Sequence, residues 1–415
     1  MLATSVLTRE VDKQASVPAG QNGGRGRGRG RGPSILGQMS DRIIAITVIV
    51  TVIFFAPMSF TYFFDETRTS NLQDKILAVL ASPEFAYGKE SGQKDADGQV
   101  LVLLRNIYAM LPHTLSGATA IIIGLAQFNR TFQFKYPVIH RNTGRLYGLC
   151  AMTICWSSAS FLIDTIPRHD VFSGEFFALI LSLLALGLFV TMVLAVYAIW
   201  NGDIGSHREF MTLNYSLMLS APVLRIFWIT LARTWGETKW VANLYSSIFA
   251  GPFLIGTSIF YLRQHHTRPA NKTLTSPKFH LATIAVGLAG LLFLAPRLSS
   301  FDQWSYRPTA SFWAVVPQWT FQAISFTVLA ERAKRHNDQR AYTAWKTYQN
   351  GIISGPAFAV GIYYFSRDVL RAPDEIMGLC TFNGGWLTGL FTSFLIYVLS
   401  TSTFANPNNR AVKAR

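Results

Sequence analysis

Apolar stretches of about twenty residues recur along this chain from Ile43 to Phe404. A helix of roughly 20 apolar residues crosses the hydrocarbon core of a bilayer, which is about 30 Å thick. Such a segment must satisfy its own backbone hydrogen bonds there, and a helix does so. Half of the 415 residues are hydrophobic and 14% are charged, so the chain cannot be a typical soluble protein. The sequence therefore predicts an all-α, polytopic transmembrane helical bundle.

Ten segments are long and apolar enough to be predicted spans. Two of them, 280–296 and 351–366, are short, so eight or nine spans also agree with the pattern. The ten segments are 43–64, 107–128, 146–166, 175–200, 210–232, 241–262, 280–296, 311–331, 351–366 and 384–404. We expect residues 41–404 to form the transmembrane domain, after a disordered Arg/Gly-rich leader over 1–40 and before a tail over 405–415.

Basic residues alternate between the loops that join these segments. Three of the four predicted cytoplasmic loops carry at least four Lys or Arg each, whereas the short opposite loops carry one or two. This positive-inside bias predicts that the leader and the tail are both cytoplasmic. We expect an integral, multi-pass protein of the endoplasmic reticulum or another endomembrane. The same bias accounts for most of the net charge of +15, so no nucleic-acid partner is expected despite the Arg–Gly repeat at 25–32.

Small residues at four-residue spacing predict where helices approach closely in lipid. A stripe on the second segment and two pairs near the C-terminal end follow this spacing. They are Gly117, Ala120 and Gly124, then Gly351 and Gly355, and Gly385 and Gly389. We interpret these positions as packing contacts.

Four ionisable residues in the second to fifth predicted spans need an explanation, because such groups are costly in a bilayer. They are His113, Asp164, Glu175 and Arg225. The predicted topology places them near one membrane face, where we expect them to converge in one pocket. A desolvated carboxylic acid can donate a proton there, which makes Asp164 and Glu175 candidate acids. His113 or Arg225 would orient the acid or a substrate oxygen. In the alternative interpretation the carboxylates are solvated at the interface and Arg225 snorkels.

A second polar cluster is predicted at the cytoplasmic face. Its residues are His140, Asp203, His207 and Glu209. A haem between helices needs two facing histidines, which His140 and His207 can supply, and His113 with His169 less convincingly. The alternative is that these are ordinary interfacial histidines.

Motifs for metal ions and phosphates are absent from the sequence. It contains no Asp-Asp pair, no Gly-x-x-x-x-Gly-Lys loop and no His-Glu-x-x-His pair. The three cysteines, Cys150, Cys155 and Cys380, lack the paired spacing of a zinc site. We therefore expect neither a metal nor a cofactor in the favoured interpretation.

Spaced polar and small residues between Leu111 and Arg225 form an extended pattern. It reads Leu111-Pro-His113-Thr-Leu-Ser-Gly117, Gly124-Leu-Ala-Gln-Phe128, Pro137-x-x-His140-Arg-x-x-Gly144-Arg145-x-Tyr147 and Gly202-Asp203-Ile204-x-x-His207-Arg208, then Met211, Tyr215 and Arg225. The pattern resembles a widespread family of multi-pass membrane proteins, with a core of about 107–232. Glu209 departs from the basic residue expected at its position. The resemblance implies the membrane fold and no single activity.

The overall architecture is also similar to the membrane-bound terpene cyclases of fungal meroterpenoid pathways, of the ascofuranone, ascochlorin and macrophorin type. This resemblance implies a lipophilic prenylated aromatic substrate. An acid would protonate a terminal epoxide or alkene of its farnesyl chain, and carbocation cyclisation would follow without a metal. Two other functions stay open: a haem-binding electron-transfer protein, and a transporter or sensor that uses the same polar groups as a substrate path.

Overall fold

The computed structural model describes residues 35–63, 72–87, 96–263, 269–297 and 306–402. Helices make up its regular elements, and no strand occurs in these ranges. By its contacts the chain divides into residues 1–40 and a compact unit of residues 41–415, and all packing below lies within the second. The predicted leader up to residue 34 and the predicted tail over 405–415 lie outside the described residues.

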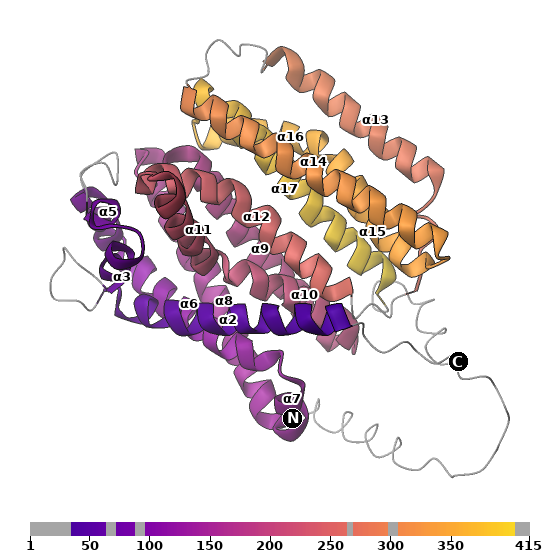
Figure 1. Cartoon of the computed structure of the whole chain (residues 1–415), viewed down its shortest axis with the longest axis horizontal. Helices are drawn as coiled ribbons and strands as arrows, with labels where there is room; N and C mark the ends of the chain where they lie inside the picture. The colour runs from indigo at the N-terminus through magenta and orange to yellow at the C-terminus, as the bar shows by residue number, and fades with distance from the viewer. Residues whose placement is uncertain (1–34, 64–71, 88–95, 264–268, 298–305, 403–415) are drawn as a thin grey trace. The chain divides into compact units, whose positions relative to one another are not determined.

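The helices of the first part of the chain end at residue 263 (Figure 1). They are α2 (Ile35–Thr61), α3 (Leu72–Leu80), α4 (Pro83–Tyr87), α5 (Ala96–Arg105), α6 (Ile107–Gln127), α7 (Arg130–Lys135), α8 (Pro137–Thr165), the 3-10 turn η3 (Ile166–Arg168), α9 (Gly174–Trp200), α10 (Ile204–Met218), α11 (Ser220–Trp235) and α12 (Lys239–Arg263). Local chemistry sets some of these ends. Pro137 opens α8 at a position that needs no N–H donor, and the Asp203 side chain caps α10.

The helices of the second part follow Ser276, whose side chain caps the first of them. They are α13 (Pro277–Leu294), the 3-10 turn η4 (Ala295–Arg297), α14 (Tyr306–Arg335), α15 (Gln339–Ile353), α16 (Gly355–Tyr364), the π-turn η6 (Phe365–Val369) and α17 (Asp374–Thr401).

Six of these helices are long and apolar enough to cross a bilayer, judged within the described residues. They are α6, α8, α9, α12, α13 and α17. A seventh span results if α10 and α11 count as one, because they pass the same test together despite a 43° bend. The prediction of an all-α polytopic bundle is confirmed, and the chain is an integral membrane protein.

The number of spans differs from the predicted ten, although all ten segments are helical over most of their length. The segment 351–366 contains a break at Ser354, which separates α15 from α16. The resulting helices of 15 and 10 residues are each too short to span a bilayer. The apolar part of α2 within the described residues, Val48–Thr61, is also short.

One cluster of buried apolar side chains runs through the bundle, from Val52 on α2 to Val398 on α17. Within it α8 packs between α6 and α9, and α17 packs against α9, α15 and α16. Several predicted glycine contacts are confirmed: Gly351 faces Gly389, and Gly385 lies against Ala359. Gly117 is different, because no atom outside its own stretch of helix backbone lies within 4 Å of the place where its Cβ would stand.

A second, smaller apolar cluster joins α3 and α4 to α11 and α12. Leu77 and Phe85 pack there against Trp228. Arg233 reinforces the contact, because its Nε and Nη2 donate to the carbonyl oxygens of Leu80 and Val79 at 2.6 and 3.1 Å. Residues 72–87 therefore form a helical segment that is packed against the bundle.

Candidate functional site

The connection between α8 and α9 has an unusual backbone. His169 and Ser173 have positive φ values of 54° and 62°, and Gly174 follows with 78°. A left-handed conformation costs a non-glycine residue about 1–2 kcal/mol, so surrounding contacts must hold it. Part of this support comes from Ser173, whose hydroxyl donates to the Trp240 carbonyl at 3.4 Å.

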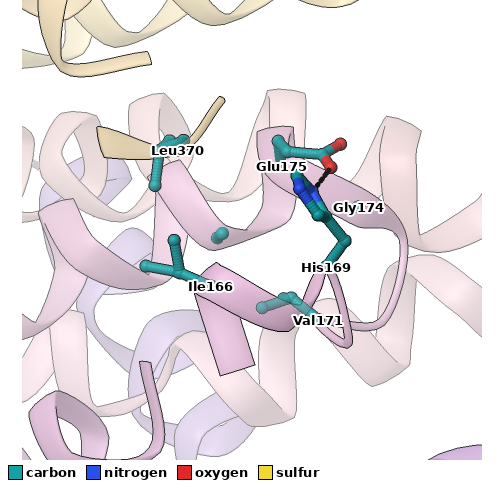
Figure 2. A pocket seen from close by; sticks show the side chains of 7 residues that line it. Ile166, His169, Val171, Gly174, Glu175 and Leu370 are labelled. Atoms are coloured by element: carbon teal, nitrogen blue, oxygen red, sulfur yellow. Dashed lines mark hydrogen bonds and ion pairs between the residues drawn. The ribbon is translucent and has the colours of Figure 1, made fainter. Parts of the chain in front are cut away.

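This turn brings the side chain of His169 to Glu175, in the first turn of α9. His169 Nδ1 lies 2.8 Å from Glu175 Oε1, and Figure 2 shows the two side chains pointing toward each other. The side chain of His169 is 46% exposed and that of Glu175 is 19% exposed. The pair therefore joins a largely buried carboxyl group to an imidazole that solvent can reach.

The His169–Glu175 pair lines a small pocket (Figure 2). Its volume is about 10 Å³, which is room for about one water molecule. Apolar side chains from Ile166, Val171 and Leu370 enclose it. Of the four predicted site residues in the spans, Glu175 is the one that lines this pocket.

An apolar groove lies between α8 and α9. Its volume is about 660 Å³, and Ile166 lines both the groove and the pocket. Many of its side chains are exposed, including Trp156 and Ile163 at 78% and 76%. On a helix that crosses a bilayer, such side chains face lipid. The groove is lined by Met152, Cys155, Trp156, Ala159, Leu162, Ile163, Ile166, Pro167, Ser182, Ala185, Leu186, Phe189 and Val369.

Asp164 lies near the end of α8 in a network of ion pairs. Its Oδ2 accepts from Arg105 Nη2 at 2.8 Å and from Asn106 Nδ2 at 2.9 Å, and its Oδ1 lies 3.1 Å from Arg168 Nη2. Arg105 also bonds Asp170 at 3.0 Å. Hydrogen bonds with Asp170 and Asp164 raise the pKa of Arg105 above its ordinary value. The network ties α5 and α6 to the end of α8.

His113 and Arg225 contact other groups. His113 Nδ1 on α6 lies 3.1 Å from Ser157 Oγ and 3.3 Å from Ser158 Oγ on α8. The guanidinium carbon of Arg225 lies 4.3 Å from the ring centroid of Trp228, and its Nε donates to Gln73. The structure thus gives each of His113, Asp164, Glu175 and Arg225 a separate set of partners.

In the second polar cluster, Asp203 has a structural role that the sequence pattern did not reveal. It caps α10, and its two carboxylate oxygens accept from the backbone N–H and the hydroxyl of Ser206 at 3.0 and 2.8 Å. His207 Nδ1 lies 3.0 Å from the Ala195 carbonyl oxygen. The His207 side chain is also within electrostatic range of His140. Glu209 is buried on α10.

His140 thus lies within electrostatic range of His207, whereas His113 and His169 have different partners. Nδ1 of His140 is a buried nitrogen with no hydrogen-bond partner among the described residues. Within the same residues no group of three or more His, Cys, Asp or Glu side chains could hold a metal ion. Cys150, Cys155 and Cys380 are buried free thiols.

Two tyrosines of the extended sequence pattern have packing roles. Tyr147 donates to Asn214 Oδ1 at 2.8 Å, and Tyr215 donates to the Ile121 carbonyl at the same distance. Gly124 lies directly against both tyrosine rings. Asn214 also donates to the Leu188 carbonyl at 2.8 Å, so these residues join α6, α8, α9 and α10. Sequence reasoning missed Asn214, which carries no motif of its own, and it considered His169 as a haem ligand with His113 and not as a partner of Glu175.

The pattern of a family described as "Predicted membrane protein (DUF2306)" matches residues 110–262. The match begins in α6 and ends in α12, so it includes the predicted core of 107–232 almost entirely and extends past it. The chain is thus similar to a family of membrane proteins, and the description names no activity. Comparisons with curated proteins and with solved structures gave no significant match.

Proposed function

We propose that this chain is a membrane-bound enzyme that protonates a lipophilic substrate, with Glu175 and His169 as its proton-carrying pair. One observation carries the proposal: the pocket that contains this pair shares Ile166 with the apolar groove between α8 and α9. A substrate dissolved in the bilayer reaches such a groove without crossing water. Concave apolar sites with few polar groups are typical of small-molecule binding.

The substrate class that we propose is an aromatic compound with a farnesyl chain that ends in an epoxide or alkene. The groove volume of about 660 Å³ suits a molecule of this size, because ligand pockets usually enclose about 300–1,000 Å³. The aromatic side chains of Trp156 and Phe189 line the groove. Aromatic ring faces attract cations, which supports a role in sheltering a carbocation.

The proposed reaction is an isomerisation that begins with one proton transfer. Glu175 gives its proton to the epoxide oxygen, and the bond from that oxygen to the more substituted carbon breaks, which leaves a hydroxyl group. The π electrons of the next alkene form a new carbon–carbon bond to that carbon. The final cation loses a proton to His169, and His169 passes this proton to Glu175, which restores both groups. Atoms and charge balance, so neither a redox partner nor a metal is required.

Asp164 is the second candidate acid. Its carboxylate contacts Arg105, Arg168 and Asn106, and it would have to lose these partners before it could hold and donate a proton. His113 and Arg225 were predicted to orient the acid or the substrate oxygen, and in the structure they contact Ser157 and Ser158, and Trp228 and Gln73, respectively. The partners of Glu175 and its place in the pocket favour it over Asp164.

Conversion of a farnesylated phenol and its terminal epoxide by membranes that contain the chain tests the proposal. We expect a cyclised isomer by mass spectrometry, at a rate that a chelator does not change. Glu175→Gln should lower turnover by about 100-fold or more, the usual contribution of a general acid. Asp368→Asn is the matched control, because Asp368 is an exposed carboxylate beside the groove residue Val369, paired with Arg367. No conversion by the wild type, or full turnover by Glu175→Gln, would reject the proposal.

Haem binding is a second candidate function, and the electrostatic interaction between His140 and His207 favours it. His207 directs Nδ1 to the Ala195 carbonyl, which leaves Nε2 for another contact, as metal-bound histidines commonly do. His140 offers a buried nitrogen without a partner among the described residues. A reduced-minus-oxidised spectrum of the purified chain decides this alternative. A haem band that His207→Ala removes would support it, and a colourless preparation would exclude it.

A further inference from the structure

Nitrogen donors surround Trp228, a buried residue of α11. The guanidinium carbon of Arg225 lies 4.3 Å and Lys239 Nζ lies 5.9 Å from the centroid of its ring. The indole Nε1–H donates to Asn243 Oδ1 at 3.1 Å. Three side chains from α11 and α12 with N–H groups thus meet at one aromatic residue.

Asn243 has a buried donor that lacks a protein partner. The residue is 0% exposed, and its Nδ2 has no hydrogen bond within the described part of the chain. Its orientation is chemically determined, because the Trp228 indole can only donate and must therefore face the amide oxygen. Buried amide donors in native proteins nearly always have an acceptor. The free Nδ2 therefore points to an acceptor supplied by a ligand.

Arg225 also has unused donors. Its one hydrogen bond among the described residues runs from Nε to Gln73 Oε1, at a long 3.4 Å. Both Nη groups make no such bond there, although a guanidinium carries five N–H donors in a planar fork. Stacking on Trp228 holds this fork in place. A fork of this kind matches the oxygen atoms of a carboxylate or phosphoryl group.

Positively charged side chains lie next to α3. Lys239 Nζ lies 3.4 Å from Asp74 on α3, and Asp74 is also within electrostatic range of Arg225. Arg233 adds a third cation, which is bonded to the carbonyl oxygens of Val79 and Leu80. Lys239 is the first residue of the candidate span Lys239–Leu262, so the cluster lies at the end of a membrane helix. Lipid phosphates lie at this depth of a bilayer.

We propose that Arg225, Lys239 and Asn243 form a binding site for a phosphoryl group beneath α3. Arg225 supplies the fork, Lys239 a compact charge and Asn243 the third donor, while Trp228 holds all three in position. An anionic phospholipid headgroup and a free phosphate share this chemistry. The site uses no residue of the His169–Glu175 pair and does not depend on the proposed function.

Binding by the purified full chain separates the two sources. One arm adds inorganic phosphate to the protein in nanodiscs of phosphatidylcholine. The other arm replaces part of that lipid with phosphatidic acid and omits phosphate. We expect the unfolding midpoint to rise in at least one arm, and native mass spectrometry to detect the retained phospholipid if the lipid is the source. Arg225→Gln should lower the apparent affinity about tenfold or more, because it removes a charge-assisted bond.

The matched control is Arg297→Gln, which removes an arginine that also stacks on an aromatic ring, at 3.7 Å from the Phe293 centroid. This variant should bind like the wild type. If Arg225→Gln fails to fold, judged by circular dichroism and gel filtration, Lys239→Gln replaces it in the same assays. Two results would overturn the proposal. One is the absence of a response in both arms. The other is equal binding by the wild type, the control and the Arg225→Gln variant (or its replacement).

Discussion

Asp164 and Glu175 are two carboxylates on either side of one interhelical turn, and their surroundings differ sharply. Asp164 accepts from Arg105 and Asn106 and pairs with Arg168. Glu175 contacts His169 at the edge of a pocket. The sequence pattern treats the two acids as equivalent candidates. The comparison teaches that the partners of a carboxylate, rather than its depth along a predicted span, separate a structural acid from a candidate catalytic one.

The partners of the two acids also differ in what they connect. The network of Asp164 joins α5, α6 and α8, so its loss should affect stability. The pair of Glu175 joins a loop to the helix that follows it, within six residues of chain. Loss of the His169–Glu175 pair should lower turnover more than it lowers the stability of the fold. Four predictions test this difference.

The largest expected effect is on turnover. Asp164→Asn should keep turnover within about tenfold of the wild type, whereas Glu175→Gln should lose about 100-fold or more, because a general acid contributes about 10²–10⁴-fold. Rates must be divided by the amount of folded protein, measured by gel filtration. A larger loss in Asp164→Asn than in Glu175→Gln would exchange the roles of the two acids.

Access of the substrate to Glu175 gives the second prediction. Ala159 lines the groove, and Ala159→Phe places a ring in it. We expect KM to rise about tenfold with little change in kcat, because the change removes uniform binding. Ala282→Phe, on the exposed surface of α13 away from the groove, is the control. An unchanged KM for Ala159→Phe would show that the groove is not the entrance.

Stability gives the third prediction, with the opposite order of the two acids. Asp164→Asn should lower the unfolding midpoint by about 2–4 °C, because it weakens several ion pairs at once. Glu175→Gln keeps a hydrogen-bonding side chain and should shift the midpoint by less than about 1 °C. Thermal unfolding in one detergent measures both. Equal shifts would contradict the structural role of Asp164.

The smallest effect is expected for a third carboxylate, Asp368. Hydrogen bonding to Arg367 lowers the pKa of Asp368 below its ordinary value of 3.8. The ion pair therefore stabilises the fold above that value, and its contribution disappears as pH falls through the lowered pKa. Both side chains are about half exposed, so the effect should be close to the detection limit. The difference in midpoint between wild type and Asp368→Asn at pH 7 and pH 3 measures it, and a growing difference at low pH would contradict the sign.

The spans were predictable because bilayer thickness acts on any segment of sufficient apolar length. Two interruptions have a signal in the sequence, because Pro222 follows the bend at Leu219 between α10 and α11, and Gly355-Pro356 follows Ser354 between α15 and α16. The predicted spans 210–232 and 351–366 ran through these positions, because apolar length alone was used to define them. The two interruptions account for two of the ten segments, whereas within the described residues α2 has only a short apolar part and α14 does not meet the criteria for a span.

The candidate site was predictable only in part. Polarity within a span identified Glu175 and Arg225, but their partners lie in turns or in helices distant in sequence. His169 reaches Glu175 because its backbone has a positive φ, which no sequence signal at that position indicates. Gln73 and Arg225 are brought together by the docking of α3 on α11. Tertiary packing creates these contacts, and a single sequence does not encode them in a local pattern.

The attachment of α13 has a consequence for the order of assembly. Gly287 and Gly290 let this helix touch the backbone at Ile353 and Pro356, while side chains such as Leu281 and Leu292 point outward at 67% and 76% exposure. A helix with so much lipid-compatible surface can first insert as an independent span and then dock. The contact of Gly287 and Gly290 with the backbone at Ile353 and Pro356 would then form late in biogenesis. A bulky residue at Gly290 should leave α13 inserted in the membrane but undocked from an otherwise assembled bundle.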